Sequence, residues 1–246
     1  MNSYQKRPDE IAKEIALLEQ FDTPTLCNTI ERFQIRSRAE GFADSSIREI
    51  IPHGKTFIGF ACTGKISTAL PAEGDSEKVA RKYFEALAQT PKPAFAIIED
   101  IDQETVGSFW GEVNVAVHRA MGCVAVVTNG GVRDLKEVSE AGFGYYAGSV
   151  VVSHAYVHVE DHNCQVTIGG LRIEPGDLIA ADQHGILNIP LETVPELVAA
   201  CRKTLAAEFP ILQGCRKAIL SGTHLSVDEL MELRKKMYRL RVSDTL

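Results

Sequence analysis

The chain has 246 residues, of which 45% are hydrophobic and 24% are charged. This length can bury a substantial core, and the composition excludes a disordered or collagen-like chain. The formal net charge is −7, and Lys and Arg are scattered until the RKK cluster at 234–236, which argues against direct binding of nucleic acid. No apolar run is long enough to span a bilayer, and the N-terminus MNSYQKRPDE is too polar for a signal peptide, so we expect no membrane contact and a cytoplasmic protein.

The six cysteines are spread along the chain without any CxxC pair, and most lie in apolar runs such as CVAVV and FACTG. This pattern is typical of reduced thiols that pack as small hydrophobic groups. It does not favour disulfides or a structural zinc site.

The N-terminal part predicts two helices followed by a strand. The stretch 10–20 has apolar residues at helical spacing. Asp22 or Thr23 then begins a second helix, with Pro24 in its first turn. The stretch 56–69 is rich in strand-forming residues and is punctuated by glycine, so we expect a β-strand there.

The middle of the chain predicts a βαβ unit. Asp75 or Ser76 can cap a helix that the following prolines end. Two short apolar runs, 94–98 and 123–127, flank a predicted helix at about 108–121. Continuously apolar strands joined by a helix are typical of parallel strands buried on both faces.

After the TNGGVRD segment we expect a short helix over 134–141, several strands and two closing helices, at about 191–208 and 226–240. Ser226 and Glu229 have the spacing of a capping box for the last helix. The predicted strands are SVVVSHAYVHVE, QVTIGGLRI, DLIAAD and ILNIP.

The predicted fold class is α/β, a layered α/β/β/α-type sandwich with a mixed central sheet and a C-terminal helical extension. We expect residues 1–210 to form the α/β domain with its N-terminal helices, and residues 211–246 to form the extension.

The strand ends of the βαβ unit bring together residues that can carry chemistry. Ligands of α/β units bind where strand ends run into helix N-termini, because free amides and helix dipoles point there. Glu112, Arg133 and Asp134 can therefore converge, and the glycine pair 130–131 would let backbone approach a ligand. Arg133 suits a carboxylate and Asp134 suits a hard cation. The simpler alternative is that Asp134 only caps the helix that follows it.

Two segments carry a resemblance to a known family. The segment WGEVNVAVHRAMGCVAVVTNGGVRDLKE resembles the signature of the RraA-type proteins, in which twenty residues separate an acidic residue from Arg-Asp; here these are Glu112 and Arg133-Asp134. The later stretch GGLRIEPGDLIAADQHGILNIP is similar to the second signature of that family. The family includes 4-hydroxy-4-methyl-2-oxoglutarate aldolases and the regulator of ribonuclease activity.

The resemblance implies a role for each residue of the predicted site. Asp134 would hold Mg²⁺ or Mn²⁺ largely through waters, Glu112 would orient one of those waters, and Arg133 would bind the pyruvyl part of the substrate. It also implies a homotrimer or homohexamer.

The same resemblance assigns the remaining ligands. The backbone amides of Val113 and Asn114, just after Gly111, would bind the substrate carboxylate. A glutamate from the closing helix of a neighbouring subunit would reach the metal waters, and Glu208 is the best match.

We therefore expect a divalent-metal-dependent lyase of the class II aldolase or decarboxylase type. It would cleave a 4-hydroxy-2-oxo acid to release pyruvate, or decarboxylate oxaloacetate. The alternative is a non-catalytic regulator that binds a ribonuclease. The sequence departs from the aldolase pattern because Glu112 replaces a shorter aspartate and about forty residues follow Pro210.

Histidines offer a further but weaker signal. His154, His158 and His162 are four residues apart, and on the predicted strand that step spans roughly 13 Å, too far for two of them to share one ion. One of His154, His158 or His184 could still line the pocket as a proton donor.

Two other features near the predicted site have structural interpretations. Trp110 is expected to serve in packing. The acidic cluster of Glu99, Asp100 and Asp102 is expected to lie in a solvated loop, with metal contact as the alternative.

Overall fold

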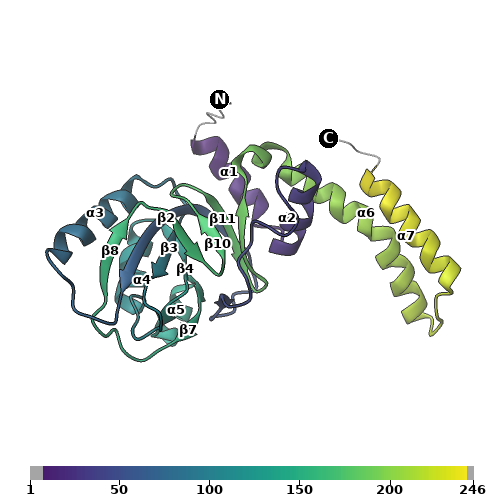
Figure 1. Cartoon of the computed structure of the whole chain (residues 1–246). Coiled ribbons are helices and arrows are strands. Elements are labelled where there is room, and N and C mark those ends of the chain that lie inside the picture. The colour runs from purple at the N-terminus through teal and green to yellow at the C-terminus, as the bar shows by residue number, and fades with distance from the viewer. Residues whose placement is uncertain (1–7, 243–246) are drawn as a thin grey trace.

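The computed structural model describes residues 8–242, which form a mixed α/β fold with a projecting helical hairpin (Figure 1). The main sheet has eight strands, in the order β1-β6-β4-β3-β2-β11-β12, and β8 pairs with β2 off this path. The strands are β1 (Arg48–Glu49), β2 (Phe57–Ser67), β3 (Ala94–Asp100), β4 (Cys123–Thr128), β5 (Gly131–Val132), β6 (Gly144–Ala147), β7 (Ser149–Val150), β8 (His158–His162), β9 (Val166–Ile168), β10 (Leu171–Ile173), β11 (Leu178–Asp182) and β12 (Gly185–Ile189). The helices are α1 (Pro8–Leu18), α2 (Thr23–Ile30), α3 (Ser76–Gln89), α4 (Glu112–Ala120), α5 (Leu135–Ala141), α6 (Val194–Leu220) and α7 (Val227–Val242), with short 3-10 helices at Glu31–Phe33 and Leu191–Thr193.

The centre of the sheet is parallel, as the apolar runs predicted. Strands β2, β3, β4 and β6 pair in parallel, and α3, α4 and α5 connect them in turn. Almost every residue of β3 and β4 is buried, because both faces of these strands are covered. The carboxyl ends of these strands therefore meet at one edge of the sheet, where the loops leading to α4 and α5 also lie.

The long strand β2 makes the sheet mixed. Its first half pairs antiparallel with β11, while its last residues pair antiparallel with β8. A β-bulge between Lys65 and Ile66 disrupts the register with β8. The prediction of a mixed central sheet is confirmed.

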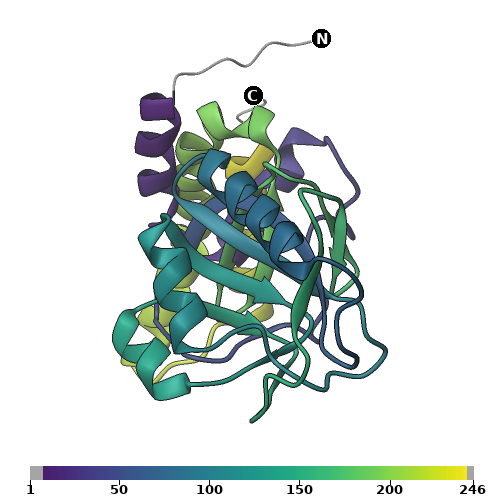
Figure 2. The same cartoon turned by 90° about the vertical axis from the view of Figure 1, so that its left-hand side faces the viewer.

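Three apolar clusters fill the space around the sheet. Helices α3, α4 and α5 cover one face, burying Tyr83, Val115 and Val138 against it. The stretch QVTIGGLRI, predicted as one strand, instead forms an antiparallel hairpin of β9 and β10, because Gly169 and Gly170 adopt positive φ in a tight turn. This hairpin packs against the other face with side chains such as Ile168. Helices α1, α2 and α6 pack with β11 and β12 (Figure 2). Leu197 of α6 is fully buried in this third cluster.

The predicted helix caps are confirmed. The Asp22 carboxylate accepts from the Thr25 amide at 2.9 Å, and the Asp75 carboxylate accepts from the Lys78 amide at 3.0 Å. Ser226 and Glu229 exchange hydrogen bonds in a capping box.

Three predicted boundaries were wrong. Helix α4 begins at Glu112 and not at 108, because the backbone of Trp110 forms a β-bridge with Val132. The predicted strand 149–160 is interrupted by a loop, so β7 ends at Val150 and β8 begins only at His158.

The third boundary concerns the C-terminal helices. Helix α6 was expected to end near 208, but it continues through Pro210 to Leu220. The predicted division between residues 210 and 211 thus falls inside one helix. Helices α6 and α7 form a hairpin that projects from the body on the side of α1 and α2, away from α4 and α5 (Figure 1). Within residues 8–242, no helix is long and apolar enough to cross a membrane.

Candidate functional site

The candidate site lies where the start of α4 meets the segment between β5 and α5. The two segments are joined by backbone: Trp110 bridges Val132, and the Arg133 amide donates to the Trp110 carbonyl at 3.1 Å. This pairing places Glu112, the first residue of α4, beside Asp134. The two loops therefore converge at one edge of the sheet, as predicted.

Asp134 has an unusual backbone conformation and reaches across to the other helix. Its φ of 57° lies in the left-handed region, which is uncommon outside glycine. Its side chain forms no capping hydrogen bond to α5, although it occupies the N-cap position of that helix. The carboxylate instead accepts from the Glu112 amide at 2.9 Å, at the N-terminus of α4. The simpler alternative, that the Asp134 side chain only caps α5, is therefore wrong.

Gly111 is required by this arrangement. A Cβ at position 111 would lie 2.4 Å from Asp134 Oδ2 and 3.2 Å from Arg133 Nε. As the N-cap of α4, Gly111 also has no side chain to satisfy the free amides of the helix. Asp134 supplies that hydrogen bond from another segment, and its anionic oxygen is favoured by the positive end of the helix dipole.

Arg133 is held through its backbone, while its guanidinium is left without a strong partner. The Tyr145 hydroxyl donates to the Arg133 carbonyl at 3.0 Å. Arg133 Nε lies 4.0 Å from Asp134 Oδ2, and it is buried without a hydrogen-bond partner in the described structure. The side chains of Arg133 and Asp134 remain 34% and 37% exposed, so both are accessible to a small anionic ligand.

The residues of this site fit a divalent cation that keeps several water ligands better than one coordinated by protein atoms alone. Glu112 is exposed, and its carboxylate and that of Asp134 are the acidic groups that the two segments offer. Mg²⁺ is commonly held by one or two carboxylates and retains several waters. Among residues 8–242 there is no cluster of three or more His, Cys, Asp or Glu side chains that could hold a metal.

Glu208 lies apart from these residues. It is on α6, and it forms an ion pair with Arg241 of α7, so it lies within the pair of helices that forms the hairpin. Its predicted contact with the metal waters therefore requires a neighbouring subunit. The predicted amide donors Val113 and Asn114 occupy the first turn of α4, next to Asp134.

The acidic cluster was expected to lie in a solvated loop, and that expectation was wrong, because Glu99 and Asp100 are the last two residues of β3. Asp100 is only 3% exposed, and its Oδ2 atom is buried without a partner in the described structure. Burial raises the pKa of Asp100 to about 6. The carboxylate of Asp102 accepts hydrogen bonds from the amides of Thr68 and Ala69 at 2.6 and 2.9 Å. Both aspartates thus organise the edge of the sheet from which the site loops emerge.

The histidines divide between the two edges of the sheet. His154 lies in the loop between β7 and β8, where its carbonyl is close to Gly107 of the loop before α4. His158 pairs with Glu160 at 2.6 Å. His184 hydrogen bonds to Asp182 at the β11–β12 turn, next to the beginning of β2 and therefore opposite the site edge. His184 does not line the candidate site.

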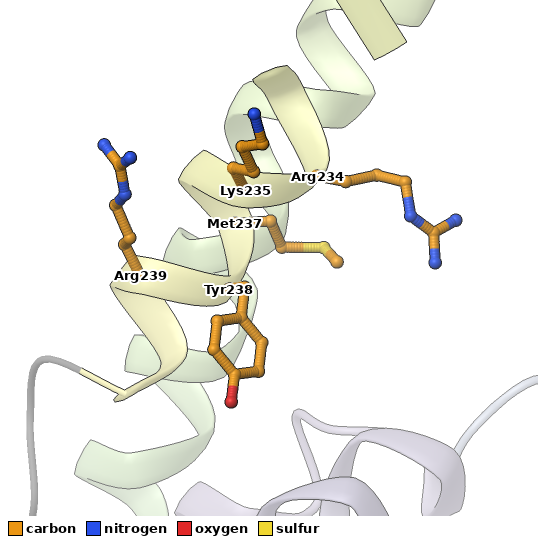
Figure 3. A pocket seen from close by; sticks show the side chains of 5 residues that line it. All are labelled: Arg234, Lys235, Met237, Tyr238 and Arg239. Carbon is orange, nitrogen blue, oxygen red and sulfur yellow. The ribbon is translucent and has the colours of Figure 1, made fainter. Parts of the chain in front are cut away.

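A hollow of about 320 Å³ lies elsewhere, on the surface of α7. Its lining residues all come from this one helix, and their side chains spread outward from it (Figure 3): Arg234, Lys235, Met237, Tyr238 and Arg239. A face formed by consecutive turns of one helix does not enclose a substrate, so this hollow is not the candidate active site.

Comparison with known proteins agrees with the resemblance in the sequence. The family described as RraA-like (Aldolase/RraA) matches residues 23–187. The chain is 24% identical over 181 residues to a Halalkalibacterium halodurans protein named "Putative 4-hydroxy-4-methyl-2-oxoglutarate aldolase", covering 72% of this chain and 78% of that protein.

Two further matches come from different bacteria. The chain is 26% identical over 141 residues to Protein DlpA of Legionella pneumophila, covering 56% of this chain but only 22% of the length of DlpA. The crystal structure of Streptomyces coelicolor RraAS2, described as an unusual member of the RNase ES inhibitor RraA protein family, has a TM-score of 0.63. The two chains share 19% identity, and the match covers 80% of this chain and 94% of the other. The chain therefore belongs to the RraA-like (Aldolase/RraA) family.

Proposed function

We propose that the protein is a divalent-metal-dependent lyase that acts on a small 2-oxo acid at Glu112, Arg133 and Asp134. The observation that carries this proposal is the conformation of Asp134, whose left-handed backbone directs its carboxylate to the N-terminus of α4 beside Arg133. Backbone strain of this kind persists where the surrounding structure enforces it, and it is concentrated at functional sites. The family includes both aldolase and ribonuclease-inhibitor members, which leaves the choice between them to the chemistry of the site.

Binding of an oxo acid uses the start of α4 together with Arg133. The free amides of Val113 and Asn114 point out of the first turn of the helix, and such amides bind carboxylates well. Arg133 offers a planar fork for the adjacent oxo and carboxylate oxygens of the pyruvyl group. Its buried Nε atom, unpartnered in the described structure, gains a hydrogen bond when such a ligand is present.

The reaction would break one C–C bond of the bound acid. In the retro-aldol direction, the bond between C3 and C4 of a 4-hydroxy-2-oxo acid would break, its electrons would pass to the enolate of pyruvate, and the 4-hydroxyl proton would pass to a water in the site as the second carbonyl forms. In oxaloacetate decarboxylation the same enolate would form as CO₂ leaves. In both reactions the enolate would then take a proton from solvent water at C3. Arg133 and the N-terminal dipole of α4 stabilise its negative charge.

Mg²⁺ or Mn²⁺, when bound, would supply Lewis-acid polarisation of the oxo group. Asp134 would hold the ion, and Glu112 would orient one of its waters. Glu208 would contribute from a neighbouring copy in a homotrimer or homohexamer. This assembly and a cytoplasmic location are part of the proposal.

The second candidate is a protein-binding regulator, which is supported by the description of RraAS2 as an unusual member of the RNase ES inhibitor RraA protein family. The net charge of −7 leaves an acidic surface for such binding. The geometry of Glu112, Arg133 and Asp134 that we propose for catalysis does not depend on ribonuclease binding.

One experiment separates the two candidates. The purified chain is assayed for pyruvate release from 4-hydroxy-2-oxo acids and oxaloacetate, with Mg²⁺, with Mn²⁺ and with EDTA, and in parallel a pull-down is performed with purified ribonuclease E-type enzymes. Metal-dependent pyruvate release supports the lyase. No release from any substrate, together with stoichiometric ribonuclease capture, contradicts it and supports the regulator.

A further inference from the structure

His118 is a fully buried histidine in the last turn of α4. Its ring is surrounded by aromatic rings, two of which belong to the residues just before the start of that helix. The ring centroid of Trp110 is 4.6 Å away, and those of Phe84, Tyr83 and Phe109 are 5.6, 5.7 and 6.0 Å away. A polar ring in such a place is costly unless its nitrogens find hydrogen-bond partners.

Both nitrogens of His118 have a partner, and the partners define the tautomer. Nδ1 lies 2.6 Å from the carbonyl oxygen of Asn114, and Nε2 lies 2.9 Å from the Tyr83 hydroxyl. A carbonyl oxygen can only accept, so Nδ1 carries the hydrogen and Nε2 accepts from Tyr83. Burial also lowers the pKa of His118 to about 4, so the ring is neutral near neutral pH.

These contacts extend to the candidate site by two routes. Asn114 is held from both sides, because its carbonyl accepts from His118 and its side-chain amide donates to the Phe109 carbonyl. Its own backbone amide is one of the proposed carboxylate donors. Trp110, which lies against the imidazole ring, is joined through its carbonyl to the amide of Arg133. The imidazole thus supports both segments that form the site.

We propose that His118, held by Tyr83 as the neutral Nδ1–H tautomer, is a positioning residue that orients the anion-binding first turn of α4. It touches neither substrate nor metal, and it acts through Asn114. The inference rests on the proposed function, since the ligand of that turn is taken to be the carboxylate of an oxo acid. Tyr83, which holds the His118 ring, is on α3, a helix that contributes no residue to the site.

Two substitutions at position 118 separate positioning from packing. His118→Asn places an amide N–H near the position of Nδ1, and His118→Gln places it near Nε2 instead. Both remove the ring, so both lower the thermal midpoint. We expect His118→Asn to bind oxalate in the presence of Mg²⁺ with an affinity within a few-fold of wild type, and His118→Gln to bind it at least about tenfold more weakly. In the pyruvate-release assay, His118→Gln should raise KM by a larger factor than it lowers kcat.

A second pair of variants gives a readout that needs no ligand. Tyr83→Phe removes the donor to His118, while the control Tyr146→Phe removes a buried hydroxyl that donates to the Ala181 carbonyl on the other face of the sheet. In ¹⁵N NMR spectra, Tyr83→Phe should shift the imidazole nitrogens of His118 and the amides of Val113 and Asn114. The control should leave them unchanged.

The outcomes distinguish the inference from the proposed function. If wild type neither binds oxalate nor releases pyruvate, the proposed function fails, and the amide shifts alone decide the role of His118. Equal oxalate affinity of the Asn and Gln variants overturns the inference. It is also overturned if Tyr83→Phe leaves the Val113 and Asn114 amides unshifted.

Discussion

Replacing Asp100 by asparagine should stabilise the protein at neutral pH, which is unusual for a buried charged residue at the edge of a site. The Asp100 side chain is 3% exposed, and one of its oxygens has no partner in the described structure. Burial raises its pKa from 3.8 to about 6. A raised pKa means that the folded state favours the protonated form. The stabilisation by Asp100 is therefore full below pH 3.8 and is lost as the pH rises through about 6.

The size of the effect follows from this shift. A rise of about two pKa units corresponds to roughly 3 kcal/mol at 1.36 kcal/mol per unit. The amide of Asp100→Asn cannot ionise, but its NH₂ group replaces the unpartnered oxygen and costs about 1 kcal/mol. We therefore expect a net gain of about 1–2 kcal/mol in the free energy of unfolding at pH 7.5, and no gain or a small loss at pH 4.

The assay is urea unfolding of both proteins at half-unit steps from pH 4 to pH 7.5. The matched control is Asp102→Asn, two residues along the chain. Burial alone would raise the pKa of Asp102, but hydrogen bonds from Thr68, Ser67 and Ala69 outweigh it and lower that pKa. The control should therefore lose stability at neutral pH. A constant difference between wild type and Asp100→Asn across the pH range would refute the reasoning.

Substitutions at three further positions test the geometry of the site. Gly111→Ala introduces a Cβ that would lie 2.4 Å from Asp134 Oδ2, so we expect a stability loss of about 1–3 kcal/mol in thermal or urea unfolding and at least tenfold weaker oxalate binding. Arg133→Lys keeps the charge but loses the planar fork, and it should lower kcat/KM and weaken inhibition by oxalate; unchanged inhibition would place the anion site elsewhere. Glu112→Gln should lower kcat more than it raises KM with little change in stability, whereas Glu112→Asp should retain activity or shift substrate preference. Full turnover of Glu112→Gln with reduced stability would remove Glu112 from the site.

The elements that sequence patterns predicted well are those with a strong local signal. The apolar runs that became β3 and β4 are buried on both faces, and such strands have few alternatives. The caps at Asp22, Asp75 and Ser226 were found because capping depends on neighbouring residues alone.

The errors arose where distant contacts outweigh local preference. The stretch before Glu112 resembles a helix, but Trp110 pairs by backbone with Val132, which is far along the chain. A helix was expected to end near 208, yet α6 continues through Pro210 and packs against α7. A proline is tolerated inside a helix when other contacts compensate for the lost hydrogen bond.

The proximity of the candidate site residues was predicted from the sequence, but the contacts that support them were not. The βαβ pattern predicted that the loops carrying Glu112 and Arg133-Asp134 converge, and the structure places Asp134 against the Glu112 amide. The left-handed conformation of Asp134 could not be predicted from the sequence, because aspartate adopts it at only a minority of positions, which tertiary contacts select. His118 was not recognised, and Asp100 was expected to be solvated, because the burial of both side chains depends on packing between segments distant in the sequence.

The central claim is that Asp134 holds the divalent ion on which turnover depends. The most direct test compares wild type and Asp134→Asn in Mg²⁺-dependent pyruvate release, with the thermal midpoint of each protein measured alongside. We expect Asp134→Asn to lower metal-dependent turnover by about 100-fold or more while the thermal midpoint stays near that of wild type, because the lost charge lies at a partly exposed position. Equal turnover of the two proteins, with the same dependence on Mg²⁺, would contradict the assignment.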